Sequence, residues 1–317
     1  MKQMSFSTPG YNKKKGKGTR REQFLTQMEQ VVPWSRLIAL IAPHYPKGAQ
    51  GRKPLPLERM LRIYCLQQWY ALSDPAMEEE LYDSQSMRSF VGISGGQDII
   101  PDESSILHFR HLLERHELTQ AILAEVNAYL GEKGLLMSRG TIVDATIIHA
   151  PTSTKNAQEE RDPEMHQTRK GKQWYFGMKA HIGVDADSGL THSVVCTPAN
   201  VADNAVMGEL VHGGEHSLWG DAGYAGEQLQ QMAEQAGFEW NVQERGHRHQ
   251  PLTEEQKRRN RERSRVRARV EHAFHVVKCL WGHVKVRYRG LAKNAAQMYA
   301  LFALANLYKM RHQLAAA

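Results

Sequence analysis

The sequence predicts an α+β protein in which a helical N-terminal region precedes a mixed five-stranded sheet with flanking helices. Up to about residue 135 the apolar residues recur only with the period of a helix. From residue 136 onward, short β-branched runs and period-two alternation appear instead. We therefore expect a basic flexible arm at residues 1–21, a helical domain at 22–135 and a second domain at 136–317.

The N-terminal elements follow from apolar spacing and from residues that begin or end helices. Residues 1–21 are rich in Gly and Lys and contain no acid, which is typical of a disordered arm. An apolar helical stripe follows and stops at Pro33, and residues 57–72 are apolar on nearly every face, which indicates a buried central helix. Further helix starts are expected at Ser73, Ser104 and Thr119, and the last of these helices ends near Gly134.

The pattern changes at Gly140. The expected strands are residues 141–148, 174–184, 190–197, 217–220 and 238–242, and the expected helices are 202–212, 227–236, 254–281 and 294–313. Residues 151–172 are polar without a period, which predicts a long loop. Three strands in a meander, followed by two that alternate with helices, is the plan of the ribonuclease-H-like fold.

Several classes of protein are disfavoured by the composition. A chain of 317 residues with 41% hydrophobic and 24% charged residues is not disordered throughout. No apolar run is long enough for a membrane span, and no secretory signal is recognisable at the N-terminus. The three cysteines form no CxxC pair, so neither a disulfide framework nor a zinc knuckle is supported. We expect a cytoplasmic, nucleoid-associated protein.

The net charge of +7 conceals a strong segregation of charge along the chain. Residues 1–21 carry +7, residues 22–244 carry −13, residues 245–293 carry +11 and the last 24 residues carry +2. Lys and Arg neutralise phosphates, whereas clustered carboxylates bind hard cations. A basic segment beside an acidic one therefore favours a nucleic-acid site next to a metal site over an unevenly charged solvated surface.

Two aspartates are candidate metal ligands. Asp144 lies within an otherwise apolar strand, where an unpaired carboxylate would cost several kcal/mol, so it requires a partner, a proton or a metal. Asp221 follows an apolar strand and precedes a tight Ala-Gly-Tyr exit. For both residues a simple turn role is the alternative. Asp185 and Asp187 are rivals, but Asp187 begins an Asp-Ser-Gly hairpin turn, so we expect a structural role for them.

Glu271 is the third candidate, and it belongs to the predicted helix 254–281. Arg267, Glu271 and Lys278 are spaced by four and seven residues, so on a regular helix they share one stripe. In isolation this pattern is explained by an i,i+4 ion pair. Beside a metal, Glu271 would be a ligand flanked by two phosphate-binding cations.

At these residues the sequence resembles bacterial insertion-sequence transposases of the DDE type, in families four and five, and the resemblance to family five covers nearly the whole chain. Further stretches that carry it are residues 143–146, 161–167, 174–189, 221–224 and 271–274. Family four has a Tyr-x₂-Arg-x₃-Glu-x₆-Lys signature, which Arg267, Glu271 and Lys278 match, but Ser264 occupies the place of the tyrosine.

The resemblance implies that Asp144, Asp221 and Glu271 form a catalytic triad that binds two Mg²⁺, with Mn²⁺ as a possible substitute. It also implies cleavage of double-stranded DNA at terminal inverted repeats and joining of the 3′-hydroxyl ends to target DNA. The helical domain would bind the ends of the element, and we expect a homodimer in the DNA complex.

Other basic residues are candidates for contacts to the DNA backbone. These DNA-binding candidates are Arg258, Arg259, Arg261 and Arg263 on the predicted long helix, Arg267 and Lys278 near Glu271, and Lys170 and Lys172 in the predicted loop. Trp174 and Tyr175 are expected in the core or on the face of a hairpin rather than stacked on bases. The helix beginning at Ser104 fits a recognition helix and plain packing equally well.

Two alternative functions remain open from the residues alone. One is a ribonuclease-H-like endonuclease that cuts DNA without joining it, and the other is a non-catalytic DNA-binding protein derived from a transposase. The three carboxylates favour an enzyme over the second alternative, and only the resemblance separates a transposase from a nuclease.

Overall fold

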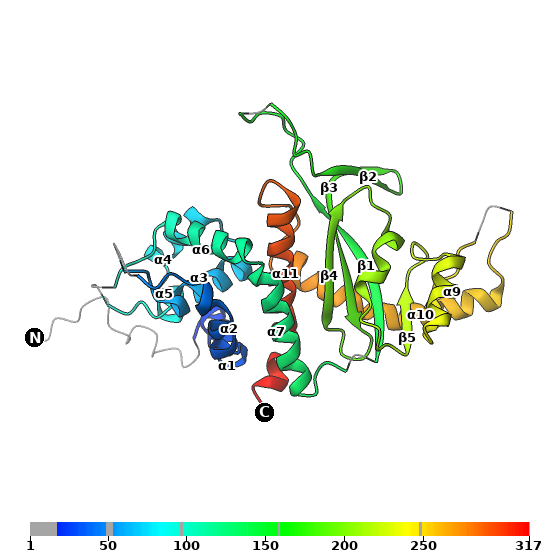
Figure 1. Ribbon diagram of the computed structural model, residues 1–317, viewed down its shortest axis with the longest axis horizontal. Coiled ribbons are helices and arrows are strands. Elements are labelled where there is room, and N and C mark those ends of the chain that lie inside the picture. The colour runs from blue at the N-terminus through cyan, green and yellow to red at the C-terminus, as the bar shows by residue number, and fades with distance from the viewer. Residues whose placement is uncertain are drawn as a thin grey trace, which may run out of the picture.

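The computed structural model describes residues 18–48, 53–95, 98–137, 139–157, 159–246 and 249–316. The molecule is elongated, with the N-terminal helices at one end, the sheet at the other and the C-terminal helix α11 (Leu291–Leu314) between them (Figure 1). Most of the predicted basic arm, up to residue 17, lies outside the described residues. Thr19 and Glu22 form a capping box that starts the first helix at Arg20, so the last two residues of the predicted arm are helical.

The N-terminal region is helical, as predicted. Its described helices are α1 (Arg20–Val31), α2 (Trp34–Ile41), the short 3₁₀ helix η2 (Ala42–His44), α3 (Leu57–Tyr70), α4 (Asp74–Asp83), α5 (Gln85–Phe90), α6 (Glu103–Arg115) and α7 (Leu118–Glu132). Helix α3 is buried from Met60 to Trp69 on nearly all sides, which confirms the expected central helix. Helix α6 begins one residue before Ser104 because the carboxylate of Asp102 accepts the backbone N–H of Ser105 (2.7 Å) and caps it.

The described strands form one mixed sheet of six. They are β1 (Gly140–His149), β2 (His166–Lys170), β3 (Gln173–Asp185), β4 (Thr191–Pro198), β5 (Ser217–Gly220) and β6 (Glu239–Val242). Strand β3 lies between β1 and β4 and is antiparallel to both, whereas β5 is parallel to β1 and to β6. This is the ribonuclease-H-like arrangement that the element order predicts.

Strand β2 is an addition to the five predicted strands. The prediction of a continuous loop over residues 151–172 was wrong, because β2 pairs with the start of β3 in a hairpin. A two-residue turn of Gly171 and Lys172 joins the strands, and Gly171 adopts the positive φ (62°) that such a turn requires. The strand was missed because both of its faces are polar and no apolar alternation marks it.

The two faces of the sheet are covered by different helices. Ile142 and Ile182 belong to the large core on the face that carries α10 (Glu254–His275) and α11. Val143 and Leu218 belong to a smaller core on the opposite face, with α8 (Met207–Leu210) and α9 (Glu227–Gln235). The predicted helix at 202–212 is shorter than expected, because its first turn is the 3₁₀ helix η3 (Asp203–Val206).

The long helix predicted for residues 254–281 changes its hydrogen-bonding pattern near its end. The regular helix α10 stops at His275 and continues as a π-helical turn, η4 (Val276–Leu280). The backbone N–H of Trp281 bonds the carbonyl of Val276, five residues earlier, at 3.1 Å. A π-helical turn alters which way the side chains after it point.

Helix α11 packs against both halves of the chain. It contacts α7 and α1 on one side and β4 on the other. Its buried Gln297 bonds Gln68 of α3 (3.0 Å), and Asn306 bonds Asn127 of α7 (2.9 Å) and the backbone of Thr191 in β4 (2.9 Å). The hydrophobic cluster around α11 includes residues from both predicted domains. Within the described ranges no helix has the length and apolar character to cross a membrane.

Candidate active site

The pairing of β1 with β5 brings Asp144 and Asp221 onto neighbouring strands. The parallel register places Ile142 opposite Trp219. Continued by two residues, it places Asp144 beside Asp221, which directly follows β5. The backbone N–H of Gly223 donates to Oδ1 of Asp221 at 2.8 Å, so the tight exit after the strand fixes this carboxylate.

Asp144 is buried and held by two donors. It is 9% exposed; its Oδ1 accepts the N–H of Ala145 (2.8 Å) and its Oδ2 accepts Nη1 of Arg267 (2.9 Å). Burial raises the pKa of Asp144 to about 7 although Arg267 and the N–H of Ala145 oppose that shift, and the charges of Asp221 and Glu271 raise the pKa further. The partner that the sequence required for this carboxylate is therefore an arginine of α10.

Arg267 links two of the three candidate acids. Its Nη2 lies 3.6 Å from Oε1 of Glu271, one turn further along α10. The side chain of Glu271 is 60% exposed, so this contact is weaker than the one to Asp144. The Nε of Arg267 is buried without a hydrogen-bond partner. The guanidinium thus stands between Asp144 and Glu271 with part of its donor capacity unused.

Lys278 also contacts β1, but it lies beyond the end of the regular α-helix that was predicted to carry it. It lies in the π-helical turn, and its Nζ donates to Oγ1 of Thr146 (2.9 Å) and to the carbonyl of Ile147 (3.1 Å). The single α-helical stripe expected for Arg267, Glu271 and Lys278 is therefore interrupted after His275. Burial, followed by repulsion from Lys170, lowers the pKa of Lys278. Arg267 and Lys278 contact β1 at separate positions on the same face.

The three candidate carboxylates are chemically suited to bind a hard divalent cation. Three carboxylates from β1, the end of β5 and α10 are the oxygen ligands that Mg²⁺ and Mn²⁺ prefer. Among the described residues, however, no group of three or more His, Cys, Asp or Glu side chains is gathered closely enough to hold a metal ion. The arrangement shows Arg267 bonded to two of the acids, and a metal would compete with it for those oxygens.

Asp185 and Asp203 have different surroundings from those of the three candidate carboxylates. Asp185 accepts the N–H of Ser188 (2.9 Å) in the β3–β4 turn, in keeping with the structural role expected for it. Asp203 was not predicted as a site residue; its Oδ1 accepts Nζ of Lys179 at 2.7 Å. A Cβ atom on Gly223 would lie 3.7 Å from Oδ2 of Asp203 and 2.9 Å from Oδ1 of Asp221. Both carboxylates therefore lie beside Gly223. Only the folded chain brings Asp203 near Asp221, since no motif links them in sequence.

The four arginines proposed on α10 divide into two pairs. Arg259 bonds Glu244 (2.9 Å), and Arg263 donates to the carbonyl of Val242 in β6 (2.7 Å). Arg258 and Arg261 are exposed. Arg259 and Arg263 therefore attach α10 to the edge of the sheet, whereas Arg258 and Arg261 are accessible to a ligand from solution.

The remaining residues singled out from the sequence lie on the β2–β3 hairpin or on α10. Lys170 and Lys172 are exposed at the tip of the hairpin. Trp174 was expected in the core or on a hairpin face; it lies on the β2–β3 hairpin and not in the core, with a side chain that is 64% exposed. Tyr175 is half-buried, with its ring 5.1 Å from that of His149. Ser264, at the place of the family-four tyrosine, donates to the carbonyl of Asn260 (2.7 Å) and accepts from Gln243 (2.6 Å).

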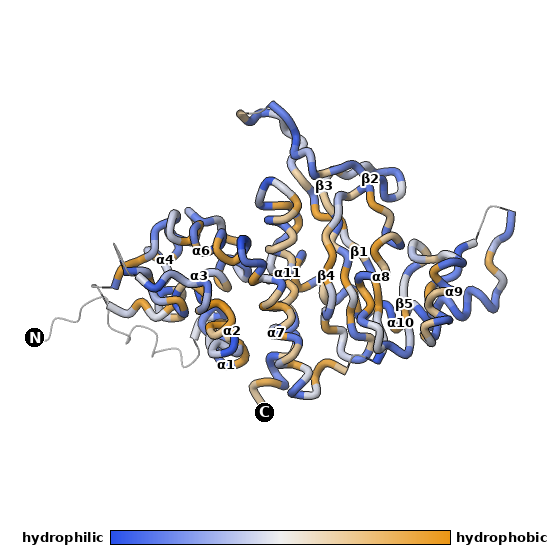
Figure 2. Tube along the Cα trace, viewed as in Figure 1, coloured by the Kyte–Doolittle hydropathy of each residue, from blue (hydrophilic) through white to orange (hydrophobic). Residues whose placement is uncertain are grey.

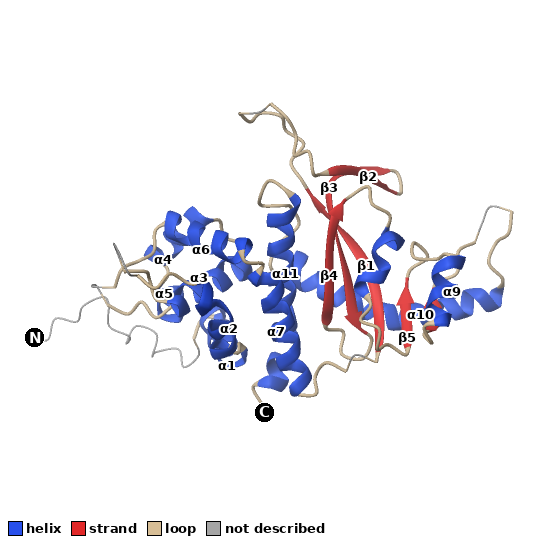
Figure 3. Cartoon of the chain, in the orientation of Figure 1, coloured by secondary structure: helices blue, strands red, loops and turns tan. Residues whose placement is uncertain are grey.

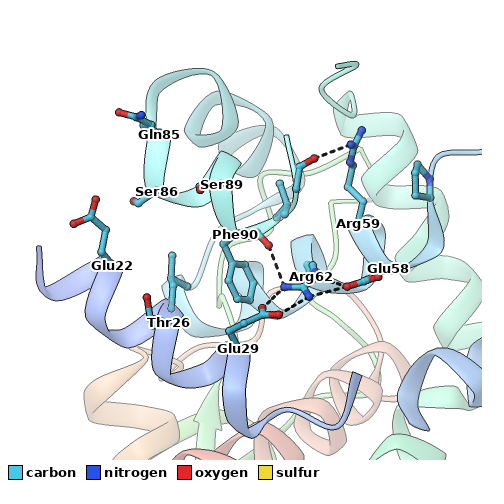
Figure 4. Close-up of a pocket in the computed structure, with 14 residues that line it drawn as sticks. Glu22, Thr26, Glu29, Glu58, Arg59, Arg62, Gln85, Ser86, Ser89 and Phe90 are labelled. Carbon is cyan, nitrogen blue, oxygen red and sulfur yellow. Dashed lines mark hydrogen bonds and ion pairs between the residues drawn. The ribbon is translucent and has the colours of Figure 1, made fainter. Parts of the chain in front are cut away.

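A cavity of about 840 Å³ lies in the N-terminal region, between α1, α3 and α5 (Figure 4), and Asp144, Asp221 and Glu271 are not among its lining residues. Its floor contains Arg62, which bonds Glu29 and Glu58 and whose guanidinium lies 4.3 Å from the centre of the Trp34 ring. Arg59 on its edge donates to the carbonyl of Gly92 (2.9 Å). Both cations are satisfied by the protein itself, so we assign the cavity no catalytic role.

Comparison with known proteins supplies the context for this geometry. A family model described as a transposase DDE domain matches residues 136–307, and a second one, described as a transposase domain, matches residues 14–112. Among solved structures, the chain is similar to a piggyBac transposase in a synaptic complex with hairpin DNA. The two share 10% sequence identity over 92% of this chain and 73% of that chain, with a TM-score of 0.47.

Proposed function

Because this chain belongs to the family of transposases with a DDE domain, we propose that it cuts DNA at the terminal inverted repeats of an insertion sequence and joins the freed 3′-hydroxyls to target DNA. Membership in the family implies nucleic-acid strand transfer or cleavage. The observation that carries the proposed chemistry is the position of Asp144 beside Asp221, where β5 ends next to β1, with Arg267 of α10 joining Asp144 to Glu271. Membership in the family supports its assignment to transposition.

In this proposal the three carboxylates are both the catalytic and the metal-binding residues. Bound Mg²⁺ ions, or Mn²⁺ in their place, would activate the attacking oxygen and stabilise the leaving one. Asp144 and Asp221 are held on adjacent strands, so their positions need little change on binding. Glu271 is exposed, so its side chain would be the member of the set that moves to meet a metal. Arg267 would exchange its carboxylate partners for a phosphate of the DNA.

Lys278 would act on a different phosphate. Its ammonium group is fixed by Thr146 and by the backbone of Ile147, two and three residues beyond Asp144 on the same strand. A cation held by two oxygen acceptors retains a third donor for a ligand. The two cations would thus orient the strand on either side of the cleaved bond without taking part in covalent chemistry.

Other cations would supply affinity that does not depend on sequence. Arg258 and Arg261 on α10 and Lys170 and Lys172 on the hairpin are exposed, and the basic arm adds to them. Figure 2 shows hydrophilic residues along the hairpin and along the end of α10 beside α9, in contrast to the more hydrophobic strands. Arg259 and Arg263 would support this surface by holding α10 in place. We further propose action as a homodimer on DNA, in the cytoplasm at the nucleoid.

The proposal is tested by incubating the protein with labelled element ends, a plasmid target and Mg²⁺. Joined products would support it. Cleavage without joining would assign an endonuclease, and a mobility shift alone would assign a non-catalytic DNA-binding protein. Repeating the reaction with EDTA, and then with Mn²⁺, tests metal dependence separately from DNA binding.

A further inference from the structure

The tip of the β2–β3 hairpin presents an aromatic ring to solvent among cations. At 64%, Trp174 has the largest exposed fraction of any large hydrophobic side chain in the described residues. It lies directly across the ladder from Arg169, and Lys170 and Lys172 are exposed beside it. Cross-strand partners point to the same side of a hairpin, so the ring and the guanidinium share one surface.

The hairpin of β2 and β3 lies at one end of the sheet (Figures 1 and 3), and hydrogen bonds attach its base to α11. Asp162 and Glu164, which precede β2, accept the backbone N–H groups of Gly290 and Leu291 at the start of α11. These carboxylates satisfy donors that the first turn of a helix leaves free, and their charge suits that end of the helix. At Gly177, where β3 meets both β1 and β2, a Cβ would lie only 2.1 Å from the carbonyl oxygen of Ile148. The tip is therefore part of an ordered, closely packed element.

The exposed ring is on the side of the sheet that carries the carboxylates. Trp174 and Ile182 are eight residues apart in β3, and Ile182 is paired with Asp144. Side chains an even number of residues apart in a strand share a face, and eight residues of strand span at most about 27 Å. The ring of Tyr175, next to Trp174, lies 5.1 Å from that of His149, and His149 is two residues beyond Ile147, whose carbonyl accepts the ammonium group of Lys278. The hairpin therefore lies near Lys278, in agreement with the repulsion from Lys170 that, after burial, lowers the pKa of Lys278. A DNA strand held by Arg267 and Lys278 would pass this tip.

The chemistry of an exposed indole among cations suits a nucleobase. Trp offers a flat face for stacking, and the neighbouring cations neutralise the phosphates on either side of the base. Within an intact duplex, both faces of each base are covered by its neighbours. A ring can therefore stack only where a face is free, at a strand end or an unpaired nucleotide.

We propose that Trp174 stacks on an unpaired or terminal base of the DNA that Arg267 and Lys278 hold, so that the hairpin selects DNA with a free base face near the cleavage site. This inference rests on the proposed function, because it takes DNA as the substrate. It assigns Trp174 to substrate selection, and not to the chemical step.

Two DNA probes of the same base-paired sequence test the proposal. One is linear with a single-stranded 3′ overhang, and the other is a relaxed, covalently closed circle that contains the same base pairs, so that every base face is covered by a neighbour. Binding is measured by mobility shift and by quenching of tryptophan fluorescence. The variants are Trp174→Ala, Trp174→Phe and, as a matched exposed aromatic on α4, Tyr82→Ala, whose side chain is 60% exposed in the native protein.

We expect the overhang probe to quench the fluorescence of the native protein more than the closed probe does. Trp174→Ala should weaken binding of the overhang probe by roughly 5- to 150-fold and leave the closed probe within about twofold. Trp174→Phe should retain most of the affinity, and Tyr82→Ala should bind both probes normally. The salt dependence should be unchanged in Trp174→Ala, because an uncharged side chain neutralises no phosphate.

Equal losses for both probes, or no loss for either, would overturn the stacking role while leaving the proposed function intact. A change of oligomer mass in Trp174→Ala without DNA would instead assign the ring to a contact between copies of the chain, and would also overturn it. Failure of the native protein to bind either probe would refute the proposed function together with this inference.

Discussion

At the scale of single residues, the site is governed by one buried carboxylate and the arginine that pairs with it. Asp144 could be identified from the sequence because a charge in an apolar strand needs compensation. Its partner could not be identified, because Arg267 reaches it across 123 positions of the chain. The i,i+4 pair of Arg267 and Glu271, which the sequence does suggest, is present at 3.6 Å but is the longer of the two contacts.

This pairing predicts a role for Arg267 in stability, in addition to its proposed role in DNA chemistry. In Arg267→Gln, Asp144 would be without its charged partner while remaining buried, so we expect the free energy of unfolding to fall by roughly 1–3 kcal/mol. Strand cleavage on bound DNA ends should slow by about tenfold or more, because the variant lacks a phosphate-binding cation. Arg265→Gln, an exposed position on the same helix, serves as the control. Native stability and a native cleavage rate in Arg267→Gln would contradict both roles.

At the scale of elements, apolar periodicity reveals helices and half-buried strands but not the details that place side chains. Five of the six strands, the buried helix α3 and the long helix α10 follow from such periodicity. Strand β2 and the exposure of Trp174 do not, because a polar hairpin projecting from a sheet has no buried face to leave a pattern. The π-helical turn that places Lys278 is also invisible, since a change of backbone hydrogen-bond register leaves no mark in composition.

The arginines of α10 should fall into two groups when they are replaced, one that affects DNA binding and one that affects stability. Neutralising Arg258 and Arg261 to Gln should weaken binding to any duplex and reduce the log–log salt slope by about one for each phosphate that is no longer neutralised. Neutralising Arg259 and Arg263 should mainly lower the melting temperature, because these residues hold α10 to Glu244 and β6. The measurements are binding titrations at several salt concentrations and thermal unfolding of both double variants. An unchanged slope in Arg258→Gln/Arg261→Gln would mean that this face is merely solvated.

At the scale of the whole molecule, the fold buries His181 and His283 in its interior. His283 is 3% exposed, and burial, followed by the charges of Arg287 and Lys278, lowers its pKa to about 4. In the unfolded chain its pKa would be about 6.5. The folded protein then binds fewer protons between these values, so the contribution of His283 to stability is complete above about pH 6.5 and disappears as the pH falls toward 4.

The variant His283→Gln isolates this contribution. Between pH 7 and pH 5, the free energy of unfolding should fall by about 1–2 kcal/mol less in the variant than in the native protein. The comparison is made between the two pH dependences, so other titrating groups, including Asp144 with its raised pKa, cancel. Denaturant titrations at both pH values provide the measurement. Parallel pH dependences would show that His283 is protonated equally in the folded and unfolded states.

The central claim, that Asp144, Asp221 and Glu271 form the catalytic set, is tested most directly by single-turnover cleavage on pre-bound element ends. Each of Asp144→Ala, Asp221→Ala and Glu271→Ala should lower cleavage and joining by at least about a hundredfold, with end binding largely retained, because affinity comes from phosphate contacts. Asp187→Ala, in the β3–β4 turn, is the control and should cleave normally. Cleavage at the native rate by Asp221→Ala would contradict the assignment and return Asp185 to consideration.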